Sequence, residues 1–414
     1  MKVLVYTSPA RGHLYPTVPI MVELTTRGHR VSVCAMADEL RHLALAGIEA
    51  SPIDPVVEGS QIEDWRERTL LGAGLSALST FAERADGEAP DLARAVSRHD
   101  PDVLLIDVNC WGAAIVAEAS GRPWAMYSPY LLQLRSRDAP PFGLGLRPLG
   151  GPLGVVRDAI FTRLGAIVDR KVMPRLNRLR ARHDLPALDR FTDLFLCPPL
   201  LLALTAEGFE YPRGDWPANV RLVGPVNWAP PSPAPAWLAT MRDPIVLVTC
   251  STERQGDERL IDTALDALPA AGMSVIATTA AHDPAAFDAP PGSKVVRFIS
   301  HEAVLERAAC VVCHGGMGIT QKALAAGVPV VVVPFGRDQL ETARRVEVAK
   351  AGVRLSPRLL TADRLASAVR TAIGRRTGAQ QVSRVYAAAG GHTAAADAIE
   401  AIAAGALSAA TDHP

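Results

Sequence analysis

A glycine-rich turn in the C-terminal half of the chain combines the residue types that hold a phosphate group. The apolar run around Val311 and Val312 gives way to this turn, and an Ala- and Leu-rich helical pattern follows it. Backbone N–H groups in such a turn, reinforced by the positive end of a helix, form a site for anions. The residues that we expect to bind phosphate here are His314, with its side-chain donor, and Gly315, Gly316, Met317, Gly318 and Ile319.

An acid and an amide follow the next apolar run. Val330–Val333 predicts a strand, and Asp338 and Gln339 come shortly after its end. In parallel sheets, loops that follow neighbouring strands meet at one rim. A carboxylate and an amide beside a diphosphate can bind sugar hydroxyls, so the two segments together indicate a nucleotide-sugar site. The alternative for Asp338 and Gln339 is an ordinary loop that leads into a helix.

His13 and Asp107 have the types and positions of a general base and its supporting acid. His13 lies on a loop after the first strand pattern, and Asp107 follows the strand pattern Val103–Ile106. Both are therefore expected to face the crevice in which α/β proteins bind ligands. An imidazole oriented by a carboxylate is an effective base for a hydroxyl group. Taken singly, the imidazole could pack under its loop and the carboxylate could cap a helix; together they favour catalysis.

These motifs together resemble the signature of family 1 glycosyltransferases, particularly the bacterial enzymes that glycosylate macrolide- and enediyne-type natural products. The likeness rests on Gly12-His-Leu-Tyr-Pro16 and on His314-Gly-Gly-Met-Gly318 followed about twenty residues later by Asp338-Gln339. The resemblance implies the GT-B fold class, two Rossmann-like, doubly wound α/β domains that face each other across a cleft. It also implies a metal-independent, inverting reaction with a nucleotide diphosphate sugar as co-substrate, either a dTDP-deoxysugar or UDP-glucose, and no cofactor.

Two further segments are similar to donor-binding segments of that family. Thr249-Cys-Ser-Thr252 is similar to the Ser-Leu-Gly-Thr turn that lines the phosphates, with Thr252 as a hydroxyl donor and Ser251 in place of the usual glycine. Arg297–Leu305 is similar to the base-binding segment. The expected nucleobase contacts are Phe298, Ile299 and His301.

The phosphate turn departs from the family pattern at Ile319, where a Ser or Thr is common. A hydroxyl–phosphate hydrogen bond is then lost unless the neighbouring Thr320 supplies it. Losing one neutral hydrogen bond costs around 1 kcal/mol, which is too little to abolish the site.

The bulk composition fits a two-domain globular enzyme. A chain of 414 residues suggests two domains of about 200 residues each, and 49% hydrophobic residues suffice for well-packed cores. Lys and Arg balance Asp and Glu at 43 each, which argues against nucleic-acid or anionic-membrane partners. No apolar run approaches the roughly 20 residues of a membrane span, so we expect no stable membrane insertion and a cytoplasmic enzyme. The expected partners are a nucleotide sugar and a small apolar acceptor; a homodimer or an auxiliary protein stays open.

The six cysteines do not form a metal or disulfide framework in the sequence. Cys310-Val-Val-Cys313 has redox or metal spacing, but it lies inside a strand pattern and no second cysteine pair accompanies it. Burial in the core is the simpler interpretation. The sequence also contains no convincing Asp-x-Asp motif, so we predict no metal site.

Strand patterns alternate with helical patterns in both halves, which predicts parallel sheets wound by helices. The expected strands are 3–6, 31–34, 103–106, 124–127, 245–248, 275–278, 295–298, 311–313 and 330–333. Between the halves, Gly224–Pro235 is rich in proline and predicts a stiff, extended linker. The expected organisation is an acceptor-binding domain at 1–223, a linker at 224–236, a nucleotide-sugar-binding domain at 237–390, and a final helix and tail at 391–414. The resemblance implies that this last helix crosses back to the N-terminal domain.

Two regions of the first half, around 55–85 and 130–185, depart from the strand–helix rhythm. The second region ends in a long amphipathic run over Val155–Leu179. One interpretation is that both regions cover the N-terminal sheet. The other, which the resemblance favours, is that they wall an apolar acceptor pocket. The aromatic residues assigned to that pocket are Trp65, Phe81, Trp111, Tyr130 and Phe142.

The leading hypothesis is an inverting glycosyltransferase of hexosyltransferase type that acts on a hydroxyl of a small apolar natural product. His13 serves as its base and Asp107 supports His13. One alternative is a glycosyltransferase-like auxiliary protein that binds a nucleotide sugar without transferring it. Another is a nucleotide-sugar epimerase of the same fold. The presence of both His13 and Asp107 argues against the first alternative, and the Asp-Gln and Gly-His-x-x-Pro motifs argue against the second.

Overall fold

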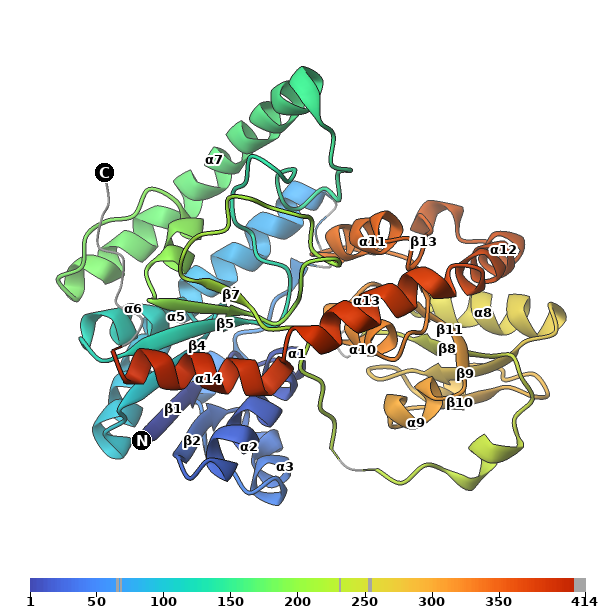
Figure 1. Cartoon of the computed structure of the whole chain (residues 1–414), viewed down its shortest axis with the longest axis horizontal. Helices are drawn as coiled ribbons and strands as arrows, with labels where there is room; N and C mark the ends of the chain where they lie inside the picture. The colour runs from blue at the N-terminus through green and yellow to red at the C-terminus, as the bar shows by residue number, and fades with distance from the viewer. Residues whose placement is uncertain (65–66, 68, 231, 252–254, 406–414) are drawn as a thin grey trace.

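The computed structural model, which describes residues 1–64, 67, 69–230, 232–251 and 255–405, contains two parallel β-sheets that lie beside each other (Figure 1). Helices cover each sheet, because strands buried on both faces need apolar cover on both sides. The apolar side chains accordingly form two buried clusters in the first half of the chain and two in the second. The cluster around Ile245 and Val311 also takes in Leu131 and Phe209 from the first half, so the two halves share packing.

The first sheet has seven parallel strands in the order β3-β2-β1-β4-β5-β6-β7. Their bounds are β1 Lys2–Tyr6, β2 Arg30–Ala35, β3 Glu49–Pro52, β4 Val103–Asp107, β5 Trp124–Ser128, β6 Leu200–Ala203 and β7 Val220–Leu222. The order reverses direction between β1 and β4. In open α/β sheets the crevice at such a switch point is where ligands bind.

The second sheet has six parallel strands in the order β10-β9-β8-β11-β12-β13. Their bounds are β8 Ile245–Thr249, β9 Ser274–Thr278, β10 Lys294–Val296, β11 Ala308–Cys313, β12 Val330–Val332 and β13 Gly352–Arg354. The switch point here lies between β8 and β11. Cys310 and Cys313 are both fully buried, which confirms their assignment to the core.

Helices fill the connections between the strands. In the first half these are α1 Arg11–Leu14, α2 Val18–Thr26, α3 Leu40–Leu45, α4 Pro55–Gly59, α5 Leu70–His99, α6 Trp111–Ala119 and α7 Gly151–Arg182. In the second they are α8 Arg259–Ala270, α9 His301–Leu305, α10 Met317–Ala325, α11 Gln339–Val348, α12 Ala362–Ile373, α13 Arg376–Ala388 and α14 Gly391–Ala403. Neither α5 nor α7, nor any other helix in the described part of the chain, combines the length and apolar character that a bilayer crossing needs.

Four strands were missed from the sequence: β3, β6, β7 and β13. Three of them are sheet edges, and edge strands are short and need little apolar sequence. The fourth, β6, is an interior strand whose apolar run follows a Pro-Pro pair that reads as a loop. The strand expected at 295–298 ends earlier, at Val296, so Phe298 lies in the loop that follows.

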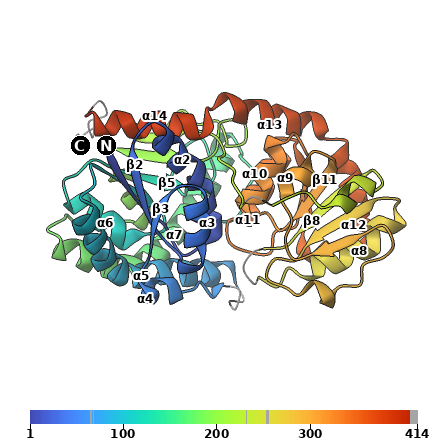
Figure 2. The ribbon, with the colours of Figure 1, turned by 90° about the horizontal axis from the view of Figure 1, so that it is seen from below.

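The chain crosses between the sheets twice, and the two crossings touch. The first runs from β7 to β8 through the proline-rich segment, and the second is the junction of α13 and α14. The amide of Gly391 donates to the carbonyl of Val223 at 2.6 Å, which ties the crossings together. Helix α14 then lies along the first sheet, against α2 (Figure 2). Arg27 anchors it through Asp397 at 2.6 Å and Glu400 at 2.8 Å.

Candidate active site

His13 and Asp107, which are far apart in the sequence, meet at the switch point of the first sheet. His13 lies in α1 just after β1, Asp107 is the last residue of β4, and β1 and β4 are hydrogen-bonded neighbours. The imidazole Nδ1 lies 2.9 Å from Oδ2 and 3.0 Å from Oδ1 of Asp107. The His13 side chain keeps 16% exposure and Asp107 has none. An imidazole reachable from the cleft and held by a buried carboxylate is the geometry of a general base.

Asp107 is held as a carboxylate by its surroundings. Burial by itself would raise its pKa, but the neighbouring His13 and hydrogen bonds from backbone amides outweigh burial and lower the pKa of Asp107 below its usual value. The amide of Asn109 donates at 2.8 Å, the hydroxyl of Ser8 at 3.1 Å and the hydroxyl of Tyr127 at 3.1 Å. These donors also fix the rotamer of the carboxylate, so the imidazole that it holds is fixed as well.

Asn109 is a site residue that the sequence did not reveal. Its Nδ2 lies 3.3 Å from Nε2 of His13, while its Oδ1 accepts from the hydroxyl of Tyr130 at 2.8 Å. Because the Tyr130 hydroxyl occupies Oδ1, the NH₂ group faces the imidazole. Nε2 is then the acceptor nitrogen and Nδ1 carries the hydrogen toward Asp107. The only sequence signal for Asn109 was its position two residues after the catalytic-type Asp107.

The glycine-rich turn after β11 is shaped by two close approaches. Gly315 has φ +101°, and a Cβ there would lie 2.6 Å from Cγ1 of Val332, so both the backbone angle and the space require glycine. A Cβ on Gly316 would lie 2.4 Å from Nε2 of His314. Helix α10 begins at Met317, so the amides of its first turn, including those of Gly318 and Ile319, point out of its N-terminus.

His314 and Ser251 lie at the same edge of the second sheet, on the loops after β11 and β8. His314 is 7% exposed, and its Nδ1 is 3.8 Å from Oδ2 of Asp257. The amide of Ser251 donates to that same oxygen at 2.7 Å. Thr320 does not supply the hydroxyl missing at Ile319, because it is buried and donates to the carbonyl of Gly316 at 2.9 Å. Thr252 lies outside the described residues.

The loop after β12 places Asp338 and Gln339 differently from each other. Asp338 is partly exposed. Burial raises the pKa of Asp338, although Arg337 and His13 both act to lower it. The side chain of Gln339 is instead buried. Its Oε1 accepts from the amides of Phe335 at 2.7 Å and Gly336 at 3.0 Å, and its NH₂ group donates to Gln255.

The residues expected to contact a nucleobase surround the start of α9. Phe298 is 55% exposed, so its ring is free to stack on a flat ligand, whereas Ile299 is 4% exposed and offers mainly its backbone. Burial, with a smaller contribution from Lys322, lowers the pKa of His301 to about 4. The imidazole of His301 is therefore neutral at pH 7, with Nε2 3.4 Å from the hydroxyl of Thr278.

The assignment of aromatic residues to an acceptor pocket needs correction for two of them. Phe81 is 7% exposed and Trp111 is 1% exposed, and they pack edge to face, at 5.7 Å between ring centres, in the core of the first domain. Side chains that are so deeply buried cannot line a ligand pocket, because their ring faces pack against other core residues. Trp65 lies outside the described residues.

Tyr130 and Phe142 do lie where the two domains meet. Both are partly buried and pack against an apolar cluster of the second domain. The Tyr130 ring is centred 5.5 Å from that of His13. Near Phe142, the amides of Gly143 and Gly145 donate to Glu341 of α11 at 2.8 and 2.7 Å, which fastens this loop to the second domain. The loop at 130–145 therefore borders the pair of His13 and Asp107.

Comparison with known proteins finds a relative that covers nearly the whole chain. The chain is 35% identical to 4′-demethylrebeccamycin synthase of Lentzea aerocolonigenes over 422 residues, which cover 96% of this chain and 99% of that protein. It is also 35% identical to a PGL/p-HBAD biosynthesis rhamnosyltransferase of Mycobacterium bovis (strain BCG / Pasteur 1173P2), over 56% of this chain and 55% of that protein. Residues 262–402 match the family described as erythromycin biosynthesis protein CIII-like, C-terminal domain.

Solved structures share the arrangement of both domains. The glycotransferase of kitacinnamycin superposes with a TM-score of 0.74 and 23% identity, covering 97% of this chain and 98% of that one. The glycosyltransferase VinC in complex with DTDP superposes with a TM-score of 0.72 and 23% identity, covering 98% and 100%. At these identities the likeness establishes a common fold across the full chain.

Proposed function

This chain belongs to the bacterial natural-product glycosyltransferases of GT-B fold, and we propose that it transfers a sugar, with inversion, from a nucleoside diphosphate sugar to a hydroxyl group of a small apolar natural product. This membership rests on the match to 4′-demethylrebeccamycin synthase, which covers nearly the whole of both proteins. Membership of this family makes the chain a glycosyltransferase. The GT-B fold expected from the sequence is likewise confirmed by the solved structures. What we propose beyond this is the donor, the acceptor, the stereochemistry of the transfer and the roles of individual residues.

The observation that carries the mechanism is the contact of His13 with Asp107 at the cleft. In the proposed reaction, Nε2 of His13 takes the proton of the acceptor hydroxyl while that oxygen bonds to the anomeric carbon. The bond from this carbon to the diphosphate oxygen breaks on the opposite face, and the nucleoside diphosphate leaves with the electron pair. Asp107 stabilises the imidazolium that forms. The transition state has oxocarbenium character, as in other glycosyl transfers.

The second domain supplies what the leaving group requires. Negative charge grows on the departing phosphate, and the first-turn amides of α10 with His314 form a preorganised set of donors for it. Asp338, on the loop after β12, is the proposed contact for a sugar hydroxyl. Gln339 would shape this loop through the backbone of Phe335 and Gly336.

The nucleobase is proposed to lie against Phe298, with His301 and the backbone of Ile299 beside it. An exposed aromatic face stacks on any base, so this contact supports binding without choosing between thymine and uracil. A neutral imidazole at His301 can donate or accept a single hydrogen bond. The solved relative bound to DTDP favours a dTDP-sugar as the first donor to test.

The acceptor side is proposed to be apolar and bounded by the 130–145 loop. Tyr130 and Phe142 offer aromatic surface next to the catalytic pair. The chain is similar to 4′-demethylrebeccamycin synthase and to the glycotransferase of kitacinnamycin, which favours the aglycones of those natural products as first acceptors.

A mass-spectrometric transfer assay tests this function. Purified protein would be mixed with dTDP- and UDP-sugars and pooled aromatic polyketide, macrolide and polyphenol acceptors. We expect a hexose or deoxyhexose mass increment on an acceptor, and its disappearance with His13→Ala while nucleotide affinity stays near normal. Acceptor-independent change of the sugar would instead indicate an epimerase, and tight nucleotide binding without transfer would indicate a non-catalytic binding protein.

A further inference from the structure

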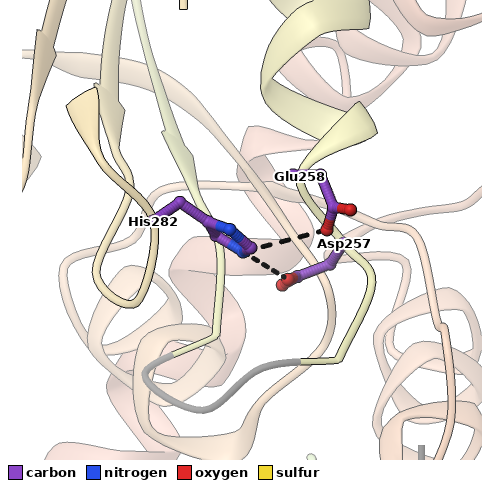
Figure 3. A group of neighbouring side chains, drawn as sticks. All are labelled: Asp257, Glu258 and His282. Carbon is purple, nitrogen blue, oxygen red and sulfur yellow. Dashed lines mark ion pairs between the residues drawn. The ribbon is translucent and has the colours of Figure 1, made fainter. Parts of the chain in front are cut away.

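Three side chains with metal-binding groups converge behind the phosphate turn. Asp257 and Glu258 stand at the start of α8, and His282 lies on the loop after β9 (Figure 3). Strands β8 and β9 are hydrogen-bonded neighbours, so the loops that follow them meet at one edge of the sheet. One ligand atom from each residue lies within 4.8 Å of the others. The sequence predicted no metal site, because these residues share no recognisable spacing.

Asp257 is the most informative member of this cluster. Its side chain has no exposure, and its Oδ2 accepts from the amide of Ser251 at 2.7 Å. Its Oδ1 is buried and, among the described residues, has no hydrogen-bond partner. Burying a carboxylate oxygen without a hydrogen-bond donor or a cation costs free energy of folding. A positively charged partner at Oδ1 would offset that cost.

The ring of His282 faces that oxygen. Its Nε2 lies 3.8 Å from Oδ1 of Asp257 and 3.8 Å from Oε2 of Glu258. Both separations are too long for hydrogen bonds, and Nε2 also has no hydrogen-bond partner within the described residues. One ring nitrogen therefore faces two carboxylate oxygens at ion-pair distance but beyond hydrogen-bond distance, and Figure 3 marks the two contacts with dashed lines.

The spacing of the three atoms fits a cation between them. Three atoms separated in this way leave a centre about 2.5 Å from each, and small side-chain rotations close this to the 2.0–2.2 Å of Zn–N and Zn–O bonds. Glu258 is 50% exposed, so water can reach the fourth position. We propose that Asp257, Glu258 and His282 bind a divalent transition-metal cation, with Zn²⁺ as the best match to one imidazole and two carboxylates.

The site has a structural role in this proposal. A cation there would fasten the start of α8 to the loop after β9, next to the loop at Ser251. It would take no part in glycosyl transfer, and the inference does not rest on the proposed function. Asp257 nevertheless connects the cation site with the glycine-rich turn, because its Oδ2 lies 3.8 Å from Nδ1 of His314.

The test is zinc binding by the full-length protein without nucleotide. Protein stripped with a chelator would be dialysed against Zn²⁺ and washed, and its metal content measured by mass spectrometry, with calorimetry for affinity. We expect one tightly held Zn²⁺ per chain and a rise in Tm on adding Zn²⁺. His282→Ala and Glu258→Gln should each lower the affinity at least tenfold and abolish the Tm rise. Both side chains are partly exposed, so the variants should fold.

His392→Ala is the matched control, because His392 is an exposed histidine far along the chain from this cluster. Its zinc content should equal that of the wild type. Zinc content that is unchanged in His282→Ala, or an absence of tight zinc binding in the wild type, would overturn the proposal. The second result would leave a simple ion pair between protonated His282 and the two carboxylates. Neither result bears on glycosyl transfer, which the mass assay measures separately.

Discussion

Arg337, on the loop after β12, binds both carboxylate oxygens of Asp64, which lies between α4 and α5 on the other side of the cleft. Its Nε is 2.9 Å from Oδ2 and 3.2 Å from Oδ1, and Nη2 is 3.0 Å from Oδ1. Asp64 is 5% exposed and Arg337 23%. Arg337 directly precedes Asp338 and has φ +52°, a conformation uncommon for a residue with a long side chain. The ion pair therefore fixes the loop after β12 to the first domain.

Removing the charge of Asp64 should loosen this connection. In Asp64→Asn we expect the free energy of unfolding to fall by about 1–3 kcal/mol, because the guanidinium loses its largely buried partner. We also expect a lower kcat/KM, since the loop that carries Asp338 is no longer held to the first domain. Chemical denaturation and steady-state kinetics measure both. Asp86→Asn is the control: its partners Arg175 and Arg182 are 41% and 68% exposed, so the loss should stay below about 1 kcal/mol. Equal losses in both variants would remove the special role of the Asp64 pair.

Replacing Asp107 should disable the reaction without emptying the nucleotide site. Asp107→Asn keeps the size of the side chain but no longer stabilises an imidazolium, so we expect kcat to fall by about 10³-fold or more. Nucleoside diphosphate affinity should change less than threefold, because its proposed contacts lie on the second domain. Single-turnover kinetics and calorimetry separate the two effects. A variant with near-normal turnover would show that His13 acts without the carboxylate.

The hydrogen bonds of Asn109 should matter for turnover rather than for donor binding. Asn109→Asp preserves the size of the side chain but replaces the NH₂ group facing Nε2 of His13 with an oxygen. We expect kcat to fall by roughly 10–100-fold, since the correct ring nitrogen is no longer favoured as the acceptor. Tyr130→Phe frees Oδ1 of Asn109 and should give a smaller loss in the same direction. If Tyr130→Phe changed only the acceptor KM, Tyr130 would be a pocket wall and nothing more.

His314 and Gly316 should act together on phosphate binding. His314→Ala should weaken nucleoside diphosphate binding by roughly 10-fold or more, the usual effect of losing one hydrogen bond to a charged group. Gly316→Ala should weaken it too, because the added Cβ would displace the imidazole from its position 2.4 Å away. Gly165→Ala is the control, since a Cβ there meets no atom within 4 Å. Calorimetry with dTDP and UDP provides the measurement, and unchanged affinity in His314→Ala would remove this residue from the phosphate site.

The partly buried imidazole of His301 should make stability depend on pH in a defined window. Its pKa in the folded protein is about 4, below the value of about 6.5 in an unfolded chain. Between pH 6.5 and 4 the unfolded state binds a proton at this imidazole and the folded state does not. The contribution of His301 to stability is therefore fully present above about pH 6.5 and falls as the pH drops toward 4. The loss attributable to this residue is at most about 3 kcal/mol. Unfolding curves at several pH values should show a weaker dependence in His301→Gln than in the wild type.

The sequence by itself determined the layout of this protein and the candidates for its central site residues. Alternating apolar runs and helical patterns predicted parallel sheets, and a histidine and an aspartate at the ends of β1 and β4 had to lie at one edge of such a sheet. Gly315 and Gly316 were recognisable because a tight phosphate turn needs residues without a Cβ. These features depend on the residue types in short segments and on the spacing of apolar residues along the chain, and both can be read from the sequence.

The tertiary structure alone decided which side chains turn toward one another. The partnership of Asn109 with Tyr130 and His13, the bridge from Arg337 to Asp64, and the convergence of His282 on Asp257 all join distant segments. The burial of Trp111 and the inward turn of Gln339 were equally invisible in the sequence. A local pattern fixes where an element begins and which residues are apolar. The rotation of a side chain, and the partner that it meets, follow from how elements far apart in the chain pack together.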